Sequence, residues 1–376
     1  MDRIRAVEAI PLAAGGAQGA YGAPYGFLVK VTTQDGLTGW GEADSHPAML
    51  KAVVEGANHF DGMSGLAAVL VGRDAMDTAG AWQVMADATH NIGRDGLTRM
   101  AMAAVDIALW DIAGKAAGKP VHALLGRQQH AGFAWYGTCG LGPTLEATAD
   151  LARGLKASGA TAGKFGWVPL GSGSAADDEA IVATLRETLG PGFAILIDGG
   201  LAFDTERAIA RARMMARYGV HWFEEALAPY DRDGYRRLRR VSPVTITAGE
   251  MASSAAELIG LIEHGCVDVV QIDLARIGIT QGLRVAEAAA RRGVACVNHT
   301  YTLGWNSAAS LHLMAVIPVV DLFEVQVHAN PLRDALTPGQ PRLAGGRVQV
   351  PEGPRLGVEP EPAALARFAV VDGGPR

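Results

Sequence analysis

The stretch AILIDGGLAFDTERAIARARMMARYGVHWFEE (residues 194–225) contains one full repeat of a pattern that runs through most of the chain. A short apolar run ends at Asp198, a helical pattern covers 205–219, and a second apolar run leads to Glu224. Strands that alternate with helices in this way are typical of a parallel sheet, because each helix carries the chain back to where the next strand must begin. The stretch therefore predicts an α/β fold in which carboxylates follow the strands.

The pattern repeats from about residue 131 onward. Its eight apolar runs are FAWYG, TAGKF, AILID, HWFEE, VTITAGE, DVVQID, VACVNH and VDLFE. Eight parallel strands are the number that closes a TIM barrel, so we predict a TIM-type barrel over 129–325. The active sites of such barrels lie at the mouth formed by the C-terminal ends of the strands.

The sequence before the barrel has a texture typical of a mixed α+β domain. YGFLVKVTTQDGLTGWGEA (25–43) contains two β-rich runs around a QDG turn and predicts a hairpin. A long helical pattern at 96–120 is closed by Gly118 and Pro120. We expect three parts: an N-terminal α+β capping domain at 1–128, the barrel at 129–325, and a Pro/Gly-rich segment at 326–376 that returns to the capping domain.

Composition excludes several classes of function. The 376 residues are 49% hydrophobic and 19% charged, which indicates a large globular core. The net charge of −6 argues against nucleic acid or an anionic membrane as a partner. Three cysteines without a CxxC pair favour neither a disulfide framework nor a zinc site, and no apolar stretch is long enough for a membrane span. We therefore expect a reduced, cytoplasmic protein.

Ionisable residues stand at the ends of seven of the predicted strands. Successive members from Asp198 to Glu324 are 23 to 26 residues apart, which is about one strand and one helix. A single carboxylate at such a position is most often a helix cap, but a ring of them around a barrel mouth needs a cation to be stable. The ring consists of Lys164, Asp198, Glu224, Glu250, Asp273, His299 and Glu324.

Three members of this ring have the chemistry of a metal site. Asp198, Glu224 and Glu250 offer only carboxylate oxygens from three consecutive strands. Hard anionic ligands without cysteine or histidine favour Mg²⁺, with Mn²⁺ as the second choice. The alternative is a rim of salt bridges with the arginines of RDGYRRLRR (232–240), but these continue into a predicted helix that faces solvent.

The remaining members suit proton transfer. A carboxylate at Asp273 would fix one nitrogen of His299 and leave the other as a proton acceptor. Lys164 would contact a substrate carboxylate or take part in proton transfer, and a protonated Glu324 would donate to a developing enolate oxygen. These groups together favour removal of a proton next to a carboxylate, with a divalent cation stabilising the ene-diolate.

Two sets of motifs carry a resemblance to a known family. AMAAVDIALWDIAGKAAGKPVHALLG (101–126), followed by the strand ends LIDGG, FEEAL, AGE, QIDLARIG, VNH and FE, resembles the enolase superfamily, in its mandelate racemase-like subgroup, over essentially the whole chain. Sites of this superfamily use a Lys or His base with Mg²⁺. The resemblance implies a (β/α)7β-type modified TIM barrel, a capping domain that carries specificity loops, and a homo-oligomer.

Departures from the family pattern bear on the reaction. Gly166 stands where subgroup members often have the second lysine of Lys-x-Lys, DGG replaces Asp-x-Asn at Gly200, and FEEA replaces Glu-Glu-Pro. Racemisation needs an acid–base group on both faces of the enolate, so a missing lysine argues against it. We expect β-elimination, as in the dehydration of a sugar acid to a 2-keto-3-deoxy acid. A cycloisomerase acting on a sugar-acid lactone or anhydro-sugar acid is the alternative.

Two loops of the capping domain are candidates for substrate contacts. AAGGAQGAYGAPYG (13–26) would act as a lid that places Tyr21 or Tyr25 over the substrate. EADSHPA (42–48) resembles the family's second specificity loop, with His46 as a candidate contact.

Two other classes of function have less support in the sequence. GSGSAA (171–176) matches a dinucleotide-binding motif, but the acidic DDE that follows it would repel a pyrophosphate. A non-catalytic acid-binding protein is the other alternative, and the complete ring argues against it.

Overall fold

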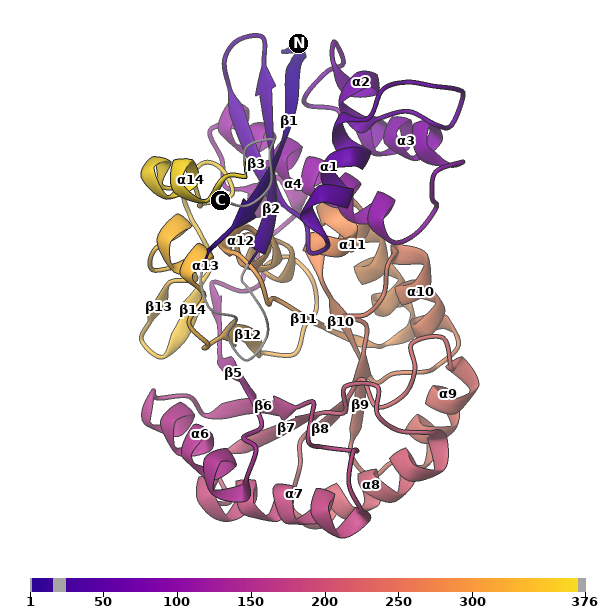
Figure 1. Cartoon of the computed structure of the whole chain (residues 1–376), viewed down its shortest axis with the longest axis vertical. Helices are drawn as coiled ribbons and strands as arrows, with labels where there is room; N and C mark the ends of the chain where they lie inside the picture. Colours follow the sequence, from indigo (N-terminus) through magenta and orange to yellow (C-terminus); the bar gives the residue numbers. More distant parts are fainter. Residues whose placement is uncertain (1, 16–24, 371–376) are drawn as a thin grey trace.

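The computed structural model describes residues 2–15 and 25–370, and within them eight parallel strands alternate with seven helices. This arrangement confirms the predicted (β/α)7β barrel (Figure 1). The strands are β5 (Trp135–Gly140), β6 (Ala162–Gly166), β7 (Ala194–Asp198), β8 (Trp222–Glu224), β9 (Thr245–Ala248), β10 (Val269–Ile272), β11 (Ala295–Asn298) and β12 (Phe323–Gln326). The helices between them are α6 (Leu145–Ala157), α7 (Ala175–Leu189), α8 (Thr205–Arg217), α9 (Arg232–Val241), α10 (Ala255–Glu263), α11 (Leu274–Arg292) and α12 (Gly304–Met314).

The last strand of the barrel, β12, is joined to its two neighbouring strands in different ways. A regular parallel ladder joins β12 to β5, whereas β11 and β12 are linked mainly through side chains. Asn298 Oδ1 accepts a hydrogen bond from the Glu324 amide (3.0 Å), and Thr300 Oγ1 donates to the Glu324 carbonyl (2.9 Å). These bonds satisfy the amide and the carbonyl of Glu324, which have no regular ladder partner on the β11 side of the barrel wall.

The inside of the barrel is apolar at the N-terminal end of the strands. Tyr136 and Trp222 pack edge to face with ring centroids 5.4 Å apart, and Leu196, Val269 and Val297 complete this layer. Because side chains alternate along a strand, the next inward positions lie one layer closer to the mouth. The ionisable residues of the ring occupy that region, so the barrel floor is mainly apolar and its mouth is charged.

Two strands extend further than the sequence predicted. Lys164 is the third of five residues in β6, and Glu324 is the second of four in β12, so the prediction that each ends its strand is wrong. Both strands continue because their last residues still pair with neighbours: Gly166 with Asp198, and Gln326 with Thr138. Both side chains nevertheless point inward below the mouth.

The N-terminal domain consists of a three-stranded antiparallel sheet and helices packed against it (Figure 1). A β-carbon at Gly41 of β3 would lie 1.9 Å from the Ala104 carbonyl oxygen, so glycine is required for helix α4 to pack this closely. The predicted hairpin is present as β2 and β3, and α4 ends at Gly118 in the left-handed region (φ 63°). The elements are β1 (Ile4–Ala13), β2 (Tyr25–Thr33), β3 (Thr38–Glu42), α1 (Pro47–Glu55), α2 (Leu66–Leu70), α3 (Thr78–Thr89) and α4 (Leu97–Ala117).

The chain after the barrel contacts the N-terminal domain. The Leu356 amide donates to Asp111 Oδ1 of α4 (2.9 Å), and the Val370 amide donates to the Pro11 carbonyl of β1 (2.9 Å). Figure 1 shows α14 beside the capping sheet. The remaining elements are α5 (Val121–Leu125), β4 (Gly132–Phe133), α13 (Pro331–Leu336), β13 (Leu343–Ala344), β14 (Arg347–Gln349) and α14 (Pro362–Phe368). Within the described residues, no helix is both long and apolar enough to cross a membrane.

A buried histidine joins α12 to this C-terminal segment and makes stability depend on pH. His312 Nε2 donates to the Leu356 carbonyl (2.9 Å), and its Nδ1 accepts from the His122 amide (3.1 Å), so the neutral ring uses both nitrogens. Burial lowers the pKa of His312 to about 3, from an ordinary value near 6.5. Between these two values the unfolded chain binds a proton that the folded chain does not. This histidine therefore makes stability fall as the pH drops below about 6.5.

We expect His312→Gln to reduce that pH dependence, because glutamine offers a donor and an acceptor without titrating. The wild-type free energy of unfolding should fall by up to about 1.4 kcal/mol per pH unit more steeply than that of the variant between pH 6.5 and 4. Urea unfolding at several pH values measures both slopes. The exposed His46→Gln is the control, and equal slopes in wild type and His312→Gln would contradict the assignment.

Candidate active site

A cavity of about 390 Å³ opens at the C-terminal end of the barrel strands. Its lining includes Lys164, Asp198, Glu250 and His299 from the predicted ring, together with Trp167 from the loop after β6. The N-terminal domain contributes Asp44, so the cavity lies between the barrel and the domain above it. This position is the one at which barrel enzymes carry their active sites.

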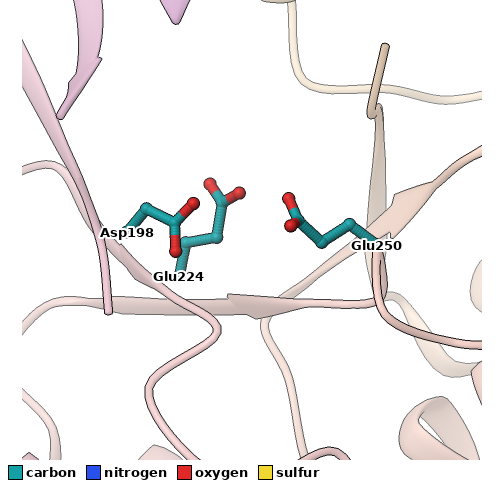
Figure 2. Close-up of side chains that lie close together, drawn as sticks. All are labelled: Asp198, Glu224 and Glu250. Atoms are coloured by element: carbon teal, nitrogen blue, oxygen red, sulfur yellow. The ribbon is translucent and has the colours of Figure 1, made fainter. Parts of the chain in front are cut away.

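Three carboxylates converge at the barrel mouth, and two of them, Asp198 and Glu250, line this cavity (Figure 2). One oxygen from each of Asp198, Glu224 and Glu250 lies within 4.8 Å of the other two, and all three residues are buried. Burial, and then the charge of Glu250, raises the pKa of Asp198 to about 6. Burial also raises the pKa of Glu224 well above its ordinary value, against the opposing effect of Lys164. Such a cluster is stabilised by added positive charge, and its all-oxygen donor set fits Mg²⁺ or Mn²⁺.

The tryptophan and glycine neighbours of these carboxylates fix their directions. Asp198 Oδ1 accepts from the Gly200 amide (2.9 Å), and Oδ2 accepts from Trp167 Nε1 (3.0 Å). Glu224 Oε2 accepts from Trp222 Nε1 (3.1 Å). Outer hydrogen bonds of this kind hold carboxylates in the orientation that a metal requires.

Lys164 lies among the carboxylates as a buried cation. Its Nζ is 2.6 Å from Glu224 Oε1, 2.9 Å from Glu324 Oε1 and 3.5 Å from Glu250 Oε2. Burial alone would lower its pKa, but the surrounding carboxylates outweigh burial and hold the pKa well above the usual value. A lysine held in its charged form is better suited to pair with an anionic substrate than to accept a proton.

His299 and Asp273 form a hydrogen-bonded pair at the cavity wall. His299 Nδ1 is 2.7 Å from Asp273 Oδ2, and Nε2 is 3.2 Å from Glu250 Oε2. Burial would lower the pKa of His299, but Glu250, Glu324 and Asp273 together raise it to about 10. The aspartate therefore occupies one ring nitrogen and leaves the other beside the carboxylate cluster.

Asp273 is positioned by a residue of α12, and a residue of the N-terminal domain caps that helix. Asp273 Oδ1 accepts from the Ala275 amide (2.8 Å) and from Asn306 Nδ2 (3.0 Å). The N-terminus of α12 has no side-chain cap from its own residues, and Glu42 of β3 accepts instead from the amides of Leu303 (2.7 Å) and Asn306 (2.9 Å). Burial raises the pKa of Glu42 to about 7.

Glu324 is fully buried beside Lys164. Its carboxylate accepts hydrogen bonds from Thr138 Oγ1 and from the Thr300 amide (2.9 Å). The structure thus brings all seven ring residues together, as the spacing of the sequence predicts. The roles assigned to them remain predictions.

The residues predicted to contact the substrate lie outside this cluster of ring residues or outside the described part of the chain. Tyr21 lies outside the described residues. Tyr25 begins β2 with 58% of its surface exposed, and His46 is exposed at the N-terminus of α1. Neither Tyr25 nor His46 is among the described residues that line the cavity, so their contact with substrate stays a prediction.

Sequence reasoning missed an ion pair across the mouth. Asp44 Oδ2 lies 3.1 Å from an Arg276 guanidinium nitrogen, and both residues line the cavity. The signals were present, because Asp44 belongs to EADSHPA and Arg276 to QIDLARIG, but their contact joins residues 232 positions apart.

Packing between strands β6 and β7 requires a glycine at position 166, in addition to the effect of a missing lysine on the chemistry. A β-carbon there would lie 2.4 Å from the Asp198 Cβ and from its carbonyl oxygen. Any side chain would therefore push β6 away from β7 and displace Asp198. A lysine at this position is therefore incompatible with the close approach of the two strands in this structure.

The dinucleotide-like motif forms a helix cap. Ser174 begins α7 in a capping box with Asp177, whose Oδ2 accepts from the Ser174 amide (2.8 Å). The acidic side chain thus occupies the helix N-terminus at which a phosphate would bind.

Fold and site together define a barrel enzyme with an acidic mouth beneath a capping domain. Residues 16–126 match the model of the mandelate racemase / muconate lactonizing enzyme N-terminal domain, and residues 147–364 match the enolase C-terminal domain-like model. The chain therefore belongs to the mandelate racemase-like branch of the enolase superfamily.

Its relatives act on sugar acids and their ring forms. D-galactarolactone cycloisomerase of Agrobacterium fabrum is 30% identical, with 92% of this chain and 91% of the relative covered. L-rhamnonate dehydratase of Saccharopolyspora erythraea is 31% identical, with 91% and 84% covered. The crystal structure of 3,6-anhydro-D-galactonate cycloisomerase from Zobellia galactanivorans has a TM-score of 0.88 at 28% identity, with 98% and 100% covered. The protein is accordingly an enzyme of this superfamily.

Proposed function

We propose that the protein removes the proton α to the carboxylate of a sugar acid and then eliminates the β-hydroxyl as water, giving a 2-keto-3-deoxy acid. The observation that carries the proposal is the His299–Asp273 pair, which places His299 Nε2 beside the carboxylate cluster, 3.2 Å from Glu250 Oε2. Asp198, Glu224 and Glu250 would hold Mg²⁺, which when bound would polarise the substrate carboxylate and neutralise the ene-diolate.

The chain's own residues supply the proton transfers. His299 Nε2 accepts the α-proton in the neutral form of the ring, and Asp273 stabilises the imidazolium that results. A cation held by the carboxylates would favour that neutral form, because it would offset the charge of Glu250 that raises the pKa of His299. The electron pair of the broken C–H bond forms the C2=C3 double bond as the hydroxyl leaves C3, and the proton on His299 converts that hydroxide to water. The enol then tautomerises to the 2-keto acid. Lys164, fixed as a cation, pairs with the negative charge on the substrate.

Ring opening of a lactone or anhydro-sugar acid is the second candidate. It begins with the same abstraction, but the leaving oxygen stays in the molecule. Two of the relatives carry cycloisomerase names, which favours this reading. A lactone expels a carboxylate, whose pKa near 4 means that it needs no proton donor at neutral pH. One dyad is sufficient for either reaction.

We expect the wild-type enzyme to form a 2-keto acid from one or more members of a panel of sugar acids, sugar lactones and anhydro-sugar acids. Interconversion of C2 epimers is not expected, since Gly166 leaves no base where the subgroup's second lysine stands. Proton NMR in D₂O follows both the product and deuterium at C2. Accumulation of a deuterated epimer without elimination or ring opening would contradict the proposal.

A further inference from the structure

Trp167 occupies an unusual position next to the carboxylate cluster. It directly follows β6, whose residues are all buried, yet 49% of its own surface is exposed and it lines the cavity. Its backbone lies in the left-handed region (φ 67°), which a bulky residue seldom adopts. Unusual backbone of this kind is retained where surrounding contacts fix it.

Those contacts converge on Asp198. Trp167 Nε1 donates to Asp198 Oδ2 (3.0 Å), and the Trp167 amide donates to the Asp198 carbonyl (3.3 Å). This bond from the indole and the bond from the Gly200 amide to Oδ1 together fix the orientation of the Asp198 carboxylate, which points toward Glu224 and Glu250. The indole therefore fixes a carboxylate that would hold the metal.

Two glycines make room for this arrangement. A β-carbon at Gly200 would lie 3.3 Å from Trp167 Cα and from its ring, and Gly200 is itself left-handed (φ 54°). A β-carbon at Gly166 would displace Asp198. Two of the three positions at which the sequence departs from the family pattern, Gly166 and Gly200, thus adjoin Trp167.

The indole also faces the substrate space from a different side than the base. Strands β5 and β12 separate β6 from β11, so Trp167 and His299 reach the cavity from different sectors of the barrel. A substrate in the cavity would have His299 on one side and a flat apolar ring on another. Aromatic faces pack well against the C–H groups of a carbohydrate and exclude water.

We propose that Trp167 has two roles: its N–H positions Asp198 for the metal, and its exposed ring is a wall against which the carbon chain or ring of the substrate packs. The second role rests on the function proposed above. By keeping water and proton donors away from its side, the wall confines proton transfer to the face that His299 serves.

Three variants separate these roles, with Mn²⁺ as the metal probe. Trp167→Phe keeps a ring and loses the N–H, Trp167→Ala loses both, and Val168→Ala alters an adjacent exposed residue (76% exposed) as the control. Electron paramagnetic resonance of free Mn²⁺ measures metal affinity without substrate. Both Trp167 variants should bind Mn²⁺ about tenfold more weakly, because a hydrogen bond to a charged group is lost, and Val168→Ala should bind normally.

Steady-state kinetics at saturating metal then test the wall. Trp167→Ala should raise KM about tenfold or more, whereas Trp167→Phe should stay within about twofold of wild type, because it keeps an aromatic face. Normal Mn²⁺ affinity in Trp167→Phe would overturn the positioning role, and an unchanged KM in Trp167→Ala would overturn the wall. If the wild type converts no acid of the panel, the proposed function fails and the wall fails with it, while the Mn²⁺ measurement still decides the positioning role.

Discussion

Replacement of His299 by asparagine is expected to reduce turnover by about 10⁴-fold, the upper range for loss of a general base. The imidazole is paired with Asp273 at 2.7 Å, and it is the one histidine among the described ring residues. Asparagine keeps a polar side chain of similar size and still reaches Asp273, so the fold should survive. Its amide cannot accept a proton at neutral pH.

Exchange of the substrate α-proton with D₂O is the decisive measurement, because it reports abstraction even when elimination is slow. His264→Asn is the matched control: His264 ends α10 and contacts the Gly260 carbonyl, away from the barrel mouth. Circular dichroism confirms that each variant is folded. Near-normal exchange in His299→Asn would transfer the base role to Lys164 and reverse our assignment.

Replacement of Asp198 by asparagine is expected to weaken Mn²⁺ binding by at least about 100-fold and to reduce turnover in parallel. Asparagine at one of the three positions proposed to hold the metal removes charge attraction and one of the two side-chain oxygens. The metal-free variant should be at least as stable as the metal-free wild type, because burial and Glu250 already oppose ionisation of Asp198. Stability and metal affinity thus change in opposite directions.

Thermal unfolding with and without Mn²⁺ tests both halves of this expectation. The metal should raise the Tm of the wild type and leave that of Asp198→Asn nearly unchanged, since only a ligand that binds the folded state stabilises it. Asp233→Asn, on the exposed face of α9, is the control. An equal rise in Tm for wild type and Asp198→Asn would show that the cation binds elsewhere, and activity that survives EDTA would argue against a metal.

The barrel and the ring could be predicted because both follow from local pattern. Short apolar runs separated by helical stretches specify a parallel sheet, and strand ends at intervals of 23 to 26 residues must meet at one mouth. Asp198, Glu224 and Glu250 therefore converge in the structure as their spacing requires. The positions of Lys164 and Glu324 within their strands were missed, because apolar or glycine residues that follow them continue the ladder.

Other features depend on contacts between distant segments. The Asp44–Arg276 pair joins the two domains and has no local signature. Trp167 has no local signature either, since its left-handed backbone and its bond to Asp198 arise only when β6 lies against β7. Gly166 was interpreted through the chemistry of a missing lysine. The structure adds a packing reason that no reading of one strand could supply.

The position of Glu42 makes the barrel depend on the N-terminal domain, and this dependence constrains how the two domains can be separated or exchanged. It completes helix α12 from another domain, and Asn306 of that helix supports the aspartate behind the base. A barrel separated from its N-terminal domain would keep every ionisable ring residue and still present an unsupported dyad. Exchange of N-terminal domains between relatives would have to preserve this pairing. A change in the N-terminal domain that moves Glu42 would therefore reach the proposed base through the first turn of α12.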